Sequence, residues 1–499
     1  MKPSIKPAAL LGAAALLSAC SLAPTYERPA APVATTFPSD SVGAAARTSV
    51  PLPLPANTRS AADTGWRDYF TDARLQQLIG AALENNRDLR TAVLRIEEAR
   101  AQYDIQSADR LPNLNASAAV TRAKTPAFLS SSGASSIGKR YDVGVSVSSF
   151  ELDFFGRVKS LNDAALASYL ATEEAQKAAQ IALVSQVAQA YYTERAYAEQ
   201  YALAQQTYEA RARTYKLTQQ RAEVGASSRL DLRSNETLME TARAAALTLA
   251  RQRAQAENAL TLLVGQPLVG TSPATGASVA PDARAGTARD ATVRSMPSDQ
   301  QIDRLSALPA GLPSDLLTRR PDIRAAEQRL QAANANIGAA RAAFFPRISL
   351  TAAVGSSSPA LHGLFDSGSG SWSFAPQLTL PIFDAGRNSA NLTLTEVRKN
   401  LAVADYEKTI QTAFREVADA LAARDYLSEQ VNAQRAVQEA QADRLRLLQL
   451  RFDNGVASSL DVLDAQRELF SAEQTLVQAR LLRTTTAIDL YRSLGGGLQ

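Results

Sequence analysis

The sequence contains an internal repeat, which limits the possible folds more than any other feature. Residues 221–231 read RAEVGASSRLD and residues 451–461 read RFDNGVASSLD, two related strings that lie 230 positions apart. The same spacing relates pairs outside these strings: Gly156 and Gly386, Arg157 and Arg387, and Gly265 and Gly495. A chance match between two helical turns would not extend so far, so we predict a duplicated half-domain.

The spacing becomes 234 positions further upstream, where it relates Asp88 to Asp322, Arg90 to Arg324, Arg95 to Arg329, and Pro112 to Pro346. The change falls within Ser- and Gly-rich segments near 121–140 and 355–371, where the length of a loop can drift. We therefore expect two structural repeats, 61–265 and 314–499. Residues 266–313, rich in Gly, Ala, Ser and Pro, are expected to form an equatorial insertion that joins them.

Composition argues against an enzyme and against a nucleic-acid-binding protein. The 499 residues include one His, His362, and one Cys, Cys20, so a metal site made of His and Cys ligands cannot be built. The sequence has no G-x-S-x-G, Walker or G-x-G-x-x-G motif. The net charge is +4, but Lys and Arg are interspersed with Asp and Glu as on solvated helix faces. We expect no catalysis, no cofactor and no nucleic-acid partner.

The first residues have the pattern of a secretion signal. Residues 1–19 contain two Lys, then an apolar run too short to span a membrane, which indicates a signal peptide. The string LSAC ends at Cys20 and resembles a bacterial lipobox, in which that Cys becomes the acylated first residue. By the same resemblance, Ser21 permits sorting to the outer membrane. Ordinary cleavage near Ala19 is the alternative. Residues 20–60, rich in Pro, Ala and Ser, are expected to form an extended linker.

Period-two alternation of apolar and polar side chains predicts four β-strands, at residues 113–122, 140–153, 346–356 and 371–383. In the second strand the alternation reverses, so we expect a bulge or a membrane exit near Ser148 and Ser149. Tyr141, Trp372 and Phe374 lie on apolar faces and are assigned to an aromatic membrane girdle.

An ordinary soluble pair of hairpins is one alternative for these strands. Two isolated hairpins are marginally stable and leave open edges, however, whereas a membrane accepts strands only in a closed barrel. Four strands are too few to close a barrel. Several chains must therefore contribute strands to it.

Long segments without Pro predict six helices, at residues 87–110, 156–220, 227–264, 319–344, 386–450 and 457–494. The two longest have about 65 residues each, roughly 97 Å at the rise of an α-helix. Each long helix is followed by a shorter return helix, 227–264 or 457–494. A return helix placed end to end with the helix that precedes a strand pair has about the length of one long helix. Each chain thus offers four columns, two continuous and two made of two pieces. A soluble coiled-coil rod is the alternative, but columns that begin and end at membrane strands favour a tube.

Several strings together resemble those of a known family. They are GLPSDLLTRRPDI (311–323), FFPRISL (344–350), LPIFDAGR (380–387), FREVADAL (414–421), RFDNGVASSLDVLDAQRELF (451–470) and the ending LYRSLGGG. Over residues 60–499 the chain resembles the TolC-like outer membrane channels of tripartite efflux systems, most closely the lipoprotein members similar to OprM.

The resemblance implies a mainly α fold with a membrane β part. Three identical chains would form a twelve-stranded β-barrel, continued by a twelve-helix α-barrel through the periplasm. The expected partners are a periplasmic adaptor (membrane fusion protein), an inner-membrane RND transporter and outer membrane lipid. The implied function is a passive exit duct for antibiotics and other small toxic compounds. Ducts for metal ions or for secreted proteins are the alternatives, and a coiled-coil structural or adaptor protein is less favoured.

The resemblance also places the repeated strings at the periplasmic tip of the tube. Gly225 and Gly455 would form the two hairpin turns, where Gly supplies conformational freedom. Ser228 and Ser458 would cap the return helices, and the turns would dock the adaptor.

The same resemblance suggests residues that close the tip. Asp231 and Asp461 lie in the first turn of each return helix, where a carboxylate favours the helix dipole; this local role is the simpler alternative. By resemblance, Asp231 would bridge to a neighbouring long helix. Asp443 and Leu445 are the further gate candidates, on the second long helix.

Overall fold

A computed structural model of the chain describes residues 22–37, 60–130, 133–268, 296–306, 308 and 313–498. The signal peptide and Cys20 lie outside these residues, as does most of the expected insertion. The chain divides into two compact units. The first comprises Met1–Ala31, Leu94–Glu174 and Ala325–Lys408, and the second comprises Pro32–Val93, Ala175–Arg324 and Thr409–Gln499.

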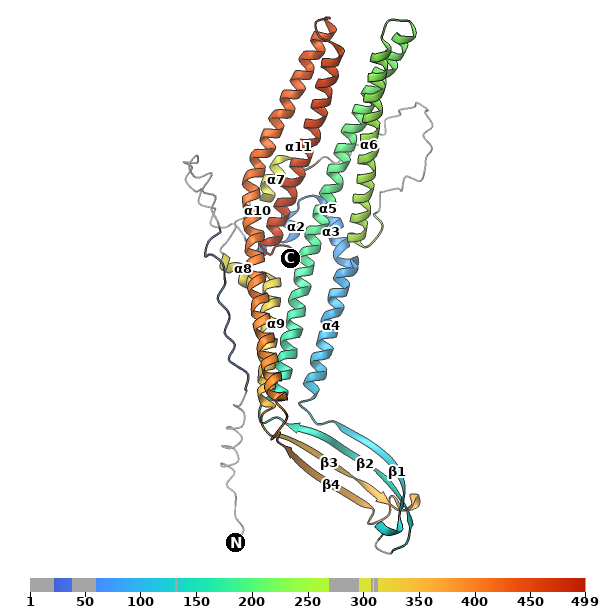
Figure 1. Ribbon diagram of the computed structural model, residues 1–499, viewed down its shortest axis with the longest axis vertical. Coiled ribbons are helices and arrows are strands. Elements are labelled where there is room, and N and C mark those ends of the chain that lie inside the picture. The colour runs from blue at the N-terminus through green and yellow to red at the C-terminus, as the bar shows by residue number, and fades with distance from the viewer. Residues whose placement is uncertain are drawn as a thin grey trace. The chain divides into compact units, whose positions relative to one another are not determined.

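The first unit contains a four-stranded antiparallel sheet in the order β1-β2-β3-β4 (Figure 1). The strands are β1 (Leu114–Thr125), β2 (Ser136–Leu152), β3 (Arg347–Ser358) and β4 (Gly370–Thr379). Each repeat supplies one hairpin, and the β2–β3 ladder joins the two. Every residue of β4 is exposed, so this edge of the sheet is uncovered within one chain.

The expected strands match in number and order, but three of their ends were wrong. β1 continues to Thr125, three residues past its expected end. β2 begins at Ser136, four residues earlier than expected, because its ladder with β1 continues to Thr125. β4 ends at Thr379 and does not reach 383. Pro381 lacks the backbone N–H that the ladder would need, which accounts for the early end.

The expected bulge in β2 is confirmed. The register between β2 and β3 shifts between Val147 and Phe150, and Ser149 has a φ of 52°. The Ser149 N–H, left out of the ladder, donates to the Thr351 hydroxyl at 3.2 Å. The extra residue explains why the apolar side chains change faces after Val147.

The helices confirm the two-fold pattern. The long ones are α5 (Arg157–Glu223) and α10 (Arg387–Asp453), each of 67 residues. Their return helices are α6 (Arg229–Val264) and α11 (Ser459–Ser493), and the helices before the strand pairs are α4 (Arg87–Ala108) and α9 (Pro321–Ala342). The expected helix 319–344 was wrong at its start, since α8 (Pro313–Arg319) is separate and Pro321 opens α9.

Several short elements were not predicted. They are η1 (Ala61–Asp63), α2 (Trp66–Tyr69), α3 (Ala73–Asn85), η2 (Ala127–Leu129), η3 (Leu361–Gly363) and α7 (Asp299–Ser306). In the second unit, α2 and α7 pack against α11. The rings of Tyr69 and Tyr491 stack at 3.9 Å, and the Tyr69 hydroxyl donates to the Leu305 carbonyl at 2.9 Å.

The two columns made of two pieces are joined in the second unit by equivalent contacts. Asn86, before α4, donates from Nδ2 to the Leu263 carbonyl at 2.9 Å. Arg320, before α9, donates from Nη1 to the Ser493 carbonyl, also at 2.9 Å. These donors lie 234 positions apart and the acceptors 230, the spacings of the repeat itself. The end of each return helix therefore meets the start of the helix that precedes a strand pair.

The described part of the N-terminal segment makes specific contacts with the first unit. Residues 22–37 are extended, but the first of them bind α9 in the first unit. Arg28 forms a bidentate ion pair with Glu327, with both distances 2.8 Å, and Asn334 donates to the Pro24 carbonyl at 2.7 Å. A Cβ on Gly338 would lie 2.8 Å from Ala23, so only Gly permits this approach. These single contacts produce no periodic pattern in the Pro-rich sequence, so the sequence could not predict them.

Candidate functional site

Both repeated strings form the turns at the ends of the long helical hairpins, as expected (Figure 1). Gly225 has a φ of 78° and Gly455 a φ of 73°, values in the left-handed region that Gly adopts most readily. The N–H of Ala226 donates to the Arg221 carbonyl at 2.7 Å, and the equivalent N–H of Val456 donates to Arg451 at 2.8 Å. These bonds satisfy carbonyl groups at the end of each long helix.

Ser228 and Ser458 cap the return helices, as expected. The Ser228 hydroxyl accepts from the N–H of Asp231 at 3.0 Å, and the Ser458 hydroxyl accepts from Asp461 at 3.2 Å. Only the second turn has the reciprocal bond, in which the Asp461 carboxylate accepts from the Ser458 N–H at 3.0 Å. The Ser458 hydroxyl and N–H lower the pKa of Asp461. The two tips are therefore similar in backbone but unequal in capping.

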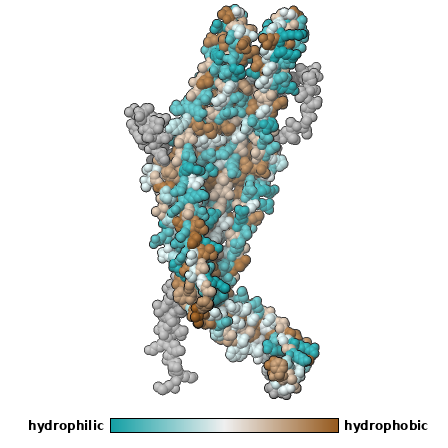
Figure 2. Space-filling model, in the orientation of Figure 1, coloured by the Kyte–Doolittle hydropathy of each residue, from teal (hydrophilic) through white to brown (hydrophobic). Residues whose placement is uncertain are grey.

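Each tip also exposes large apolar side chains. Leu230 and Leu460, at equivalent positions of the repeat, are 76% and 73% exposed, and Val224 and Val456 are exposed as well. Figure 2 shows hydrophobic residues among polar ones at the ends of both hairpins. Apolar side chains held in water at a turn are available for contact with another protein.

The structure does not bring the gate candidates together within one chain. The Asp231 carboxylate accepts from the hydroxyl of its own cap, Ser228, at 2.7 Å, and no described long-helix residue pairs with it. Asp443 pairs with Arg446 one turn along α10 at 2.7 Å, and Leu445 is half-buried. A role for these residues between chains stays a prediction.

Two arginines of the hairpins were missed by the sequence reasoning. Arg444 on α10 pairs with Asp464 on α11 at 3.2 Å and so ties a long helix to its return helix. Arg211 on α5 is buried, and its Nη1 donates to the Leu238 carbonyl of α6 at 3.0 Å. Burial lowers the pKa of Arg211. The sequence spacing indicated the burial of Arg211, because this residue follows the buried Ala204 by seven positions, the heptad spacing of one helix face.

The proposed girdle residues lie on the sheet of the first unit. Trp372 pairs in register with Val354 and Phe374 with Ala352, and both aromatic side chains are exposed on one face of β4. Tyr141, on β2, pairs in register with Ser358 on β3 and is half-buried. Their place in a membrane interface stays a prediction.

The part of the chain that the structure describes contains no group of three or more His, Cys, Asp or Glu side chains placed to hold a metal ion. Within the same ranges, no helix has the length and apolar character needed to cross a bilayer.

The unequal capping predicts unequal stability of the tips. Asp461→Ala removes the carboxylate that accepts from the N–H and hydroxyl of Ser458, while the residue 461 N–H can still donate to the Ser458 hydroxyl. With half of the capping box lost, we expect the amides of residues 459–463 to lose hydrogen-exchange protection. Asp231→Ala should have a smaller effect, because Asp231 lacks the bond to the cap N–H. The lowered pKa means that the Asp461 contribution is present at neutral pH and is lost as the pH falls below about 4. Equal losses at both tips, or a difference between Asp461→Ala and wild type that persists at acid pH, would contradict this.

Comparison with known proteins matches the two halves separately. A family model described as "Outer membrane efflux protein" matches residues 78–266 and 312–496. Outer membrane protein OprJ of Pseudomonas aeruginosa is 48% identical over 499 residues, which covers 99% of this chain and 96% of that protein. The antibiotic efflux pump outer membrane protein ArpC of Pseudomonas putida is 45% identical over 482 residues, covering 97% of this chain and 93% of ArpC.

The fold has a close counterpart among solved structures. The crystal structure of the open state of the MtrE outer membrane channel of Neisseria gonorrhoeae matches with a TM-score of 0.80 and 42% sequence identity. The match covers 96% of this chain and 99% of that one. The two repeats, the four strands and the long hairpins thus recur together in an outer membrane channel.

Proposed function

Because this chain belongs to the outer membrane efflux protein family and is an outer membrane channel, we propose that it is the exit duct of a tripartite pump for antibiotics and other small toxic compounds. The proposed partners are a periplasmic adaptor and an inner-membrane RND transporter. The relative ArpC, named as part of an antibiotic efflux pump, supports this class of cargo.

The observation that carries the proposal is the uncovered sheet. Four strands in one chain leave β1 and β4 as edges, and all residues of β4 and almost all of β1 are exposed. A membrane cannot accommodate unpaired strand edges, so β4 of one copy must pair with β1 of the next. Three copies would supply twelve strands and close the barrel. The paired long helices of three copies would line the periplasmic part of the duct.

We further propose that Cys20 carries the lipid anchor in the outer membrane. The segment that follows it binds α9 through Arg28 and Asn334, which supports a fixed path for the chain just after the anchor. The hairpin tips, with Leu230 and Leu460 exposed, would dock the adaptor. Asp231, Asp443 and Leu445 would then narrow the entrance between neighbouring chains, with Asp461 serving mainly as a cap.

The proposal is tested by the accumulation of ethidium in cells that lack the gene. We expect accumulation to rise in the deleted strain and to return to the parental level when the gene is restored, because a pump without its outer duct cannot release cargo outside. A strain lacking only the inner-membrane pump should behave like the deleted strain. Unchanged accumulation of several dyes and antibiotics would overturn the proposed cargo and direct the search to metal ions or secreted proteins.

A further inference from the structure

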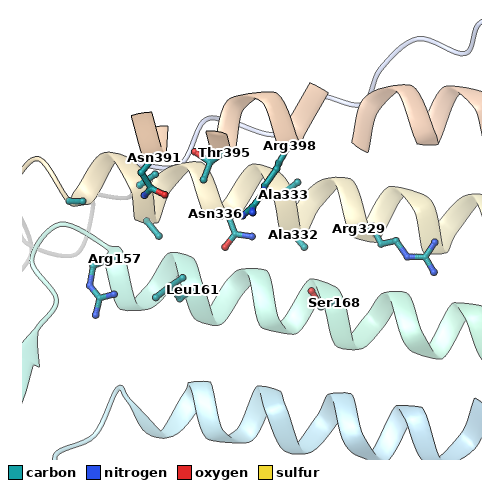
Figure 3. A pocket seen from close by; sticks show the side chains of 13 residues that line it. Arg157, Leu161, Ser168, Arg329, Ala332, Ala333, Asn336, Asn391, Thr395 and Arg398 are labelled. Atoms are coloured by element: carbon teal, nitrogen blue, oxygen red, sulfur yellow. The ribbon is translucent and has the colours of Figure 1, made fainter. Parts of the chain in front are cut away.

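A basic pocket opens between α5, α9 and α10 in the first unit (Figure 3). It has a volume of about 540 Å³, within the range of small-molecule sites. Three of its lining residues are cationic, namely Arg157, Arg329 and Arg398, and none is acidic. Half of the remaining lining residues are alanines, and the others are Leu161 and neutral polar side chains such as Asn336.

Two of the three cations in the pocket lack an acidic partner. Arg157 forms a bidentate pair with Glu151, with both distances 2.7 Å, so its charge is compensated. Arg329 and Arg398 form no ion pair with any described residue, and both are exposed to solvent. In Figure 3 the side chain of Arg398 extends from α10 toward Ala333 and Asn336. The pocket therefore has a net positive charge and free guanidinium donors.

The pocket and the N-terminal segment lie on opposite faces of α9. The segment contacts Glu327, Asn334 and Gly338. The pocket is lined by Arg329 and Asn336, each two residues further along. Two residues on an α-helix correspond to a rotation of about 200°, so the two sets point in nearly opposite directions.

This geometry assigns the pocket to the inside of the duct, an assignment that rests on the proposed function. The acyl chain on Cys20 would insert into the bilayer that surrounds the barrel. The segment that follows Cys20 must therefore run along the outside of the closed tube. The opposite face of α9 then faces the lumen. Three copies would place three such pockets, with six uncompensated guanidinium groups, around one passage.

We propose that this pocket binds small amphiphilic anions on their way through the duct. A carboxylate, sulfonate or phosphate group would pair with Arg329 and Arg398, whose planar donors suit such groups. The apolar body of the molecule would lie against the alanine wall. The charges of three copies in a narrow lumen would also raise the local concentration of anions.

The test is binding of 1-naphthoate to the full-length protein in nonionic detergent, measured by isothermal titration with empty micelles as the blank. We expect saturable binding that weakens at least about tenfold in the double variant Arg329→Gln/Arg398→Gln, because two charge-assisted contacts are lost. The neutral analogue 1-naphthalenemethanol should not show saturable binding. Higher salt should weaken naphthoate binding to the wild type.

Arg341→Gln is the matched control. It removes one positive charge from α9, the helix that also carries Arg329, but Arg341 contacts the N-terminal segment and does not line the pocket. This variant should bind naphthoate like the wild type. Equal binding by all three proteins, or equally tight binding of the neutral analogue, would overturn the proposal.

Ethidium accumulation in the same strains separates this inference from the proposed function. Ethidium is a cation, so its export does not require the anion pocket, and the double variant should restore it. Restored ethidium export with unchanged naphthoate binding would overturn the pocket alone. If restoring the wild-type gene to the deleted strain does not restore ethidium export, the proposed exit duct is overturned, whatever the result of the binding measurement.

Discussion

Arg320→Ala should lower the free energy of unfolding by about 3–5 kcal/mol, because it removes charge-assisted hydrogen bonds to two carboxylates, each worth about 1.5–3 kcal/mol. Arg320 is 7% exposed and joins three partners. Its guanidinium donates to Asp322 at 3.0 and 2.6 Å and to Glu416 at 2.9 Å, besides the Ser493 carbonyl. Burial by itself lowers the pKa of Arg320, but Asp322 and Glu416 raise it above the ordinary value, so the group stays charged. Removal of the Arg320 side chain would leave Glu416 without this partner. It would also break the contact between the end of α11 and the start of α9.

Asn86→Ala is the matched control, since Asn86 occupies the equivalent joint of the first repeat. It loses two neutral hydrogen bonds, one donated to the Leu263 carbonyl and one accepted from the Leu89 N–H at the start of α4, for which we expect about 2 kcal/mol in total. Thermal unfolding of each protein in detergent, followed by circular dichroism, compares the two. A shift for Arg320→Ala no larger than that for Asn86→Ala would show that the ionic network does not hold the joint.

Gly355→Ala should prevent assembly of the channel in the membrane. Gly355 on β3 pairs with Gly144 on β2, and the two backbones are unusually close. A Cβ on Gly355 would lie 2.6 Å from the Gly144 Cα and also overlap the Val143 carbonyl oxygen. These are backbone atoms of a ladder, so they cannot move aside without breaking it. Because β2–β3 is the ladder that joins the two hairpins, its loss should leave little or no folded channel.

Gly138→Ala controls for the loss of a strand glycine. Gly138 lies in β2, where an added Cβ would meet only the Ala123 carbonyl oxygen, at 4.0 Å. The measurement is the amount of protein that reaches the outer membrane fraction in protease-resistant form. Gly138→Ala should match the wild type, and normal assembly of Gly355→Ala would contradict the close-approach argument. Gly144→Ala should fail in the same way, since its Cβ would lie 3.0 Å from the Gly355 Cα.

Features with a local or periodic signal were predictable from the sequence. The repeated strings predicted the turns at Gly225 and Gly455 and the caps at Ser228 and Ser458. Alternation predicted the strands and the bulge near Ser149, because a change of parity on a strand requires an extra residue. The break at Pro381 was missed because the apolar side chains of residues 380–383 continue past it, although the ladder does not.

Contacts between residues far apart in the sequence could not be predicted. Arg28 and Glu327 are separated by 299 positions, and neither lies in a pattern that singles it out. The stack of Tyr69 on Tyr491 depends on α2, a helix of four residues that is too short to give a periodic signal. The second arginine in RRPDI marked the family, but only the structure shows that it ties α9 to the end of α11. The sequence likewise contained Arg329 and Arg398 without indicating that they share a pocket.

The N-terminal contacts have a consequence for how deeply the channel sits in its bilayer. Arg341, at the end of α9, donates to the Leu22 carbonyl at 3.4 Å. With Cys20 acylated as proposed, the two intervening steps span at most roughly 7 Å, so the periplasmic surface of the membrane must lie near that level. β3 begins at Arg347, and its apolar length gives a second, independent measure of the same boundary. The anchor and the strands would thus both fix the position of the periplasmic boundary, and lengthening the segment before Leu22 would leave only the strands to fix it.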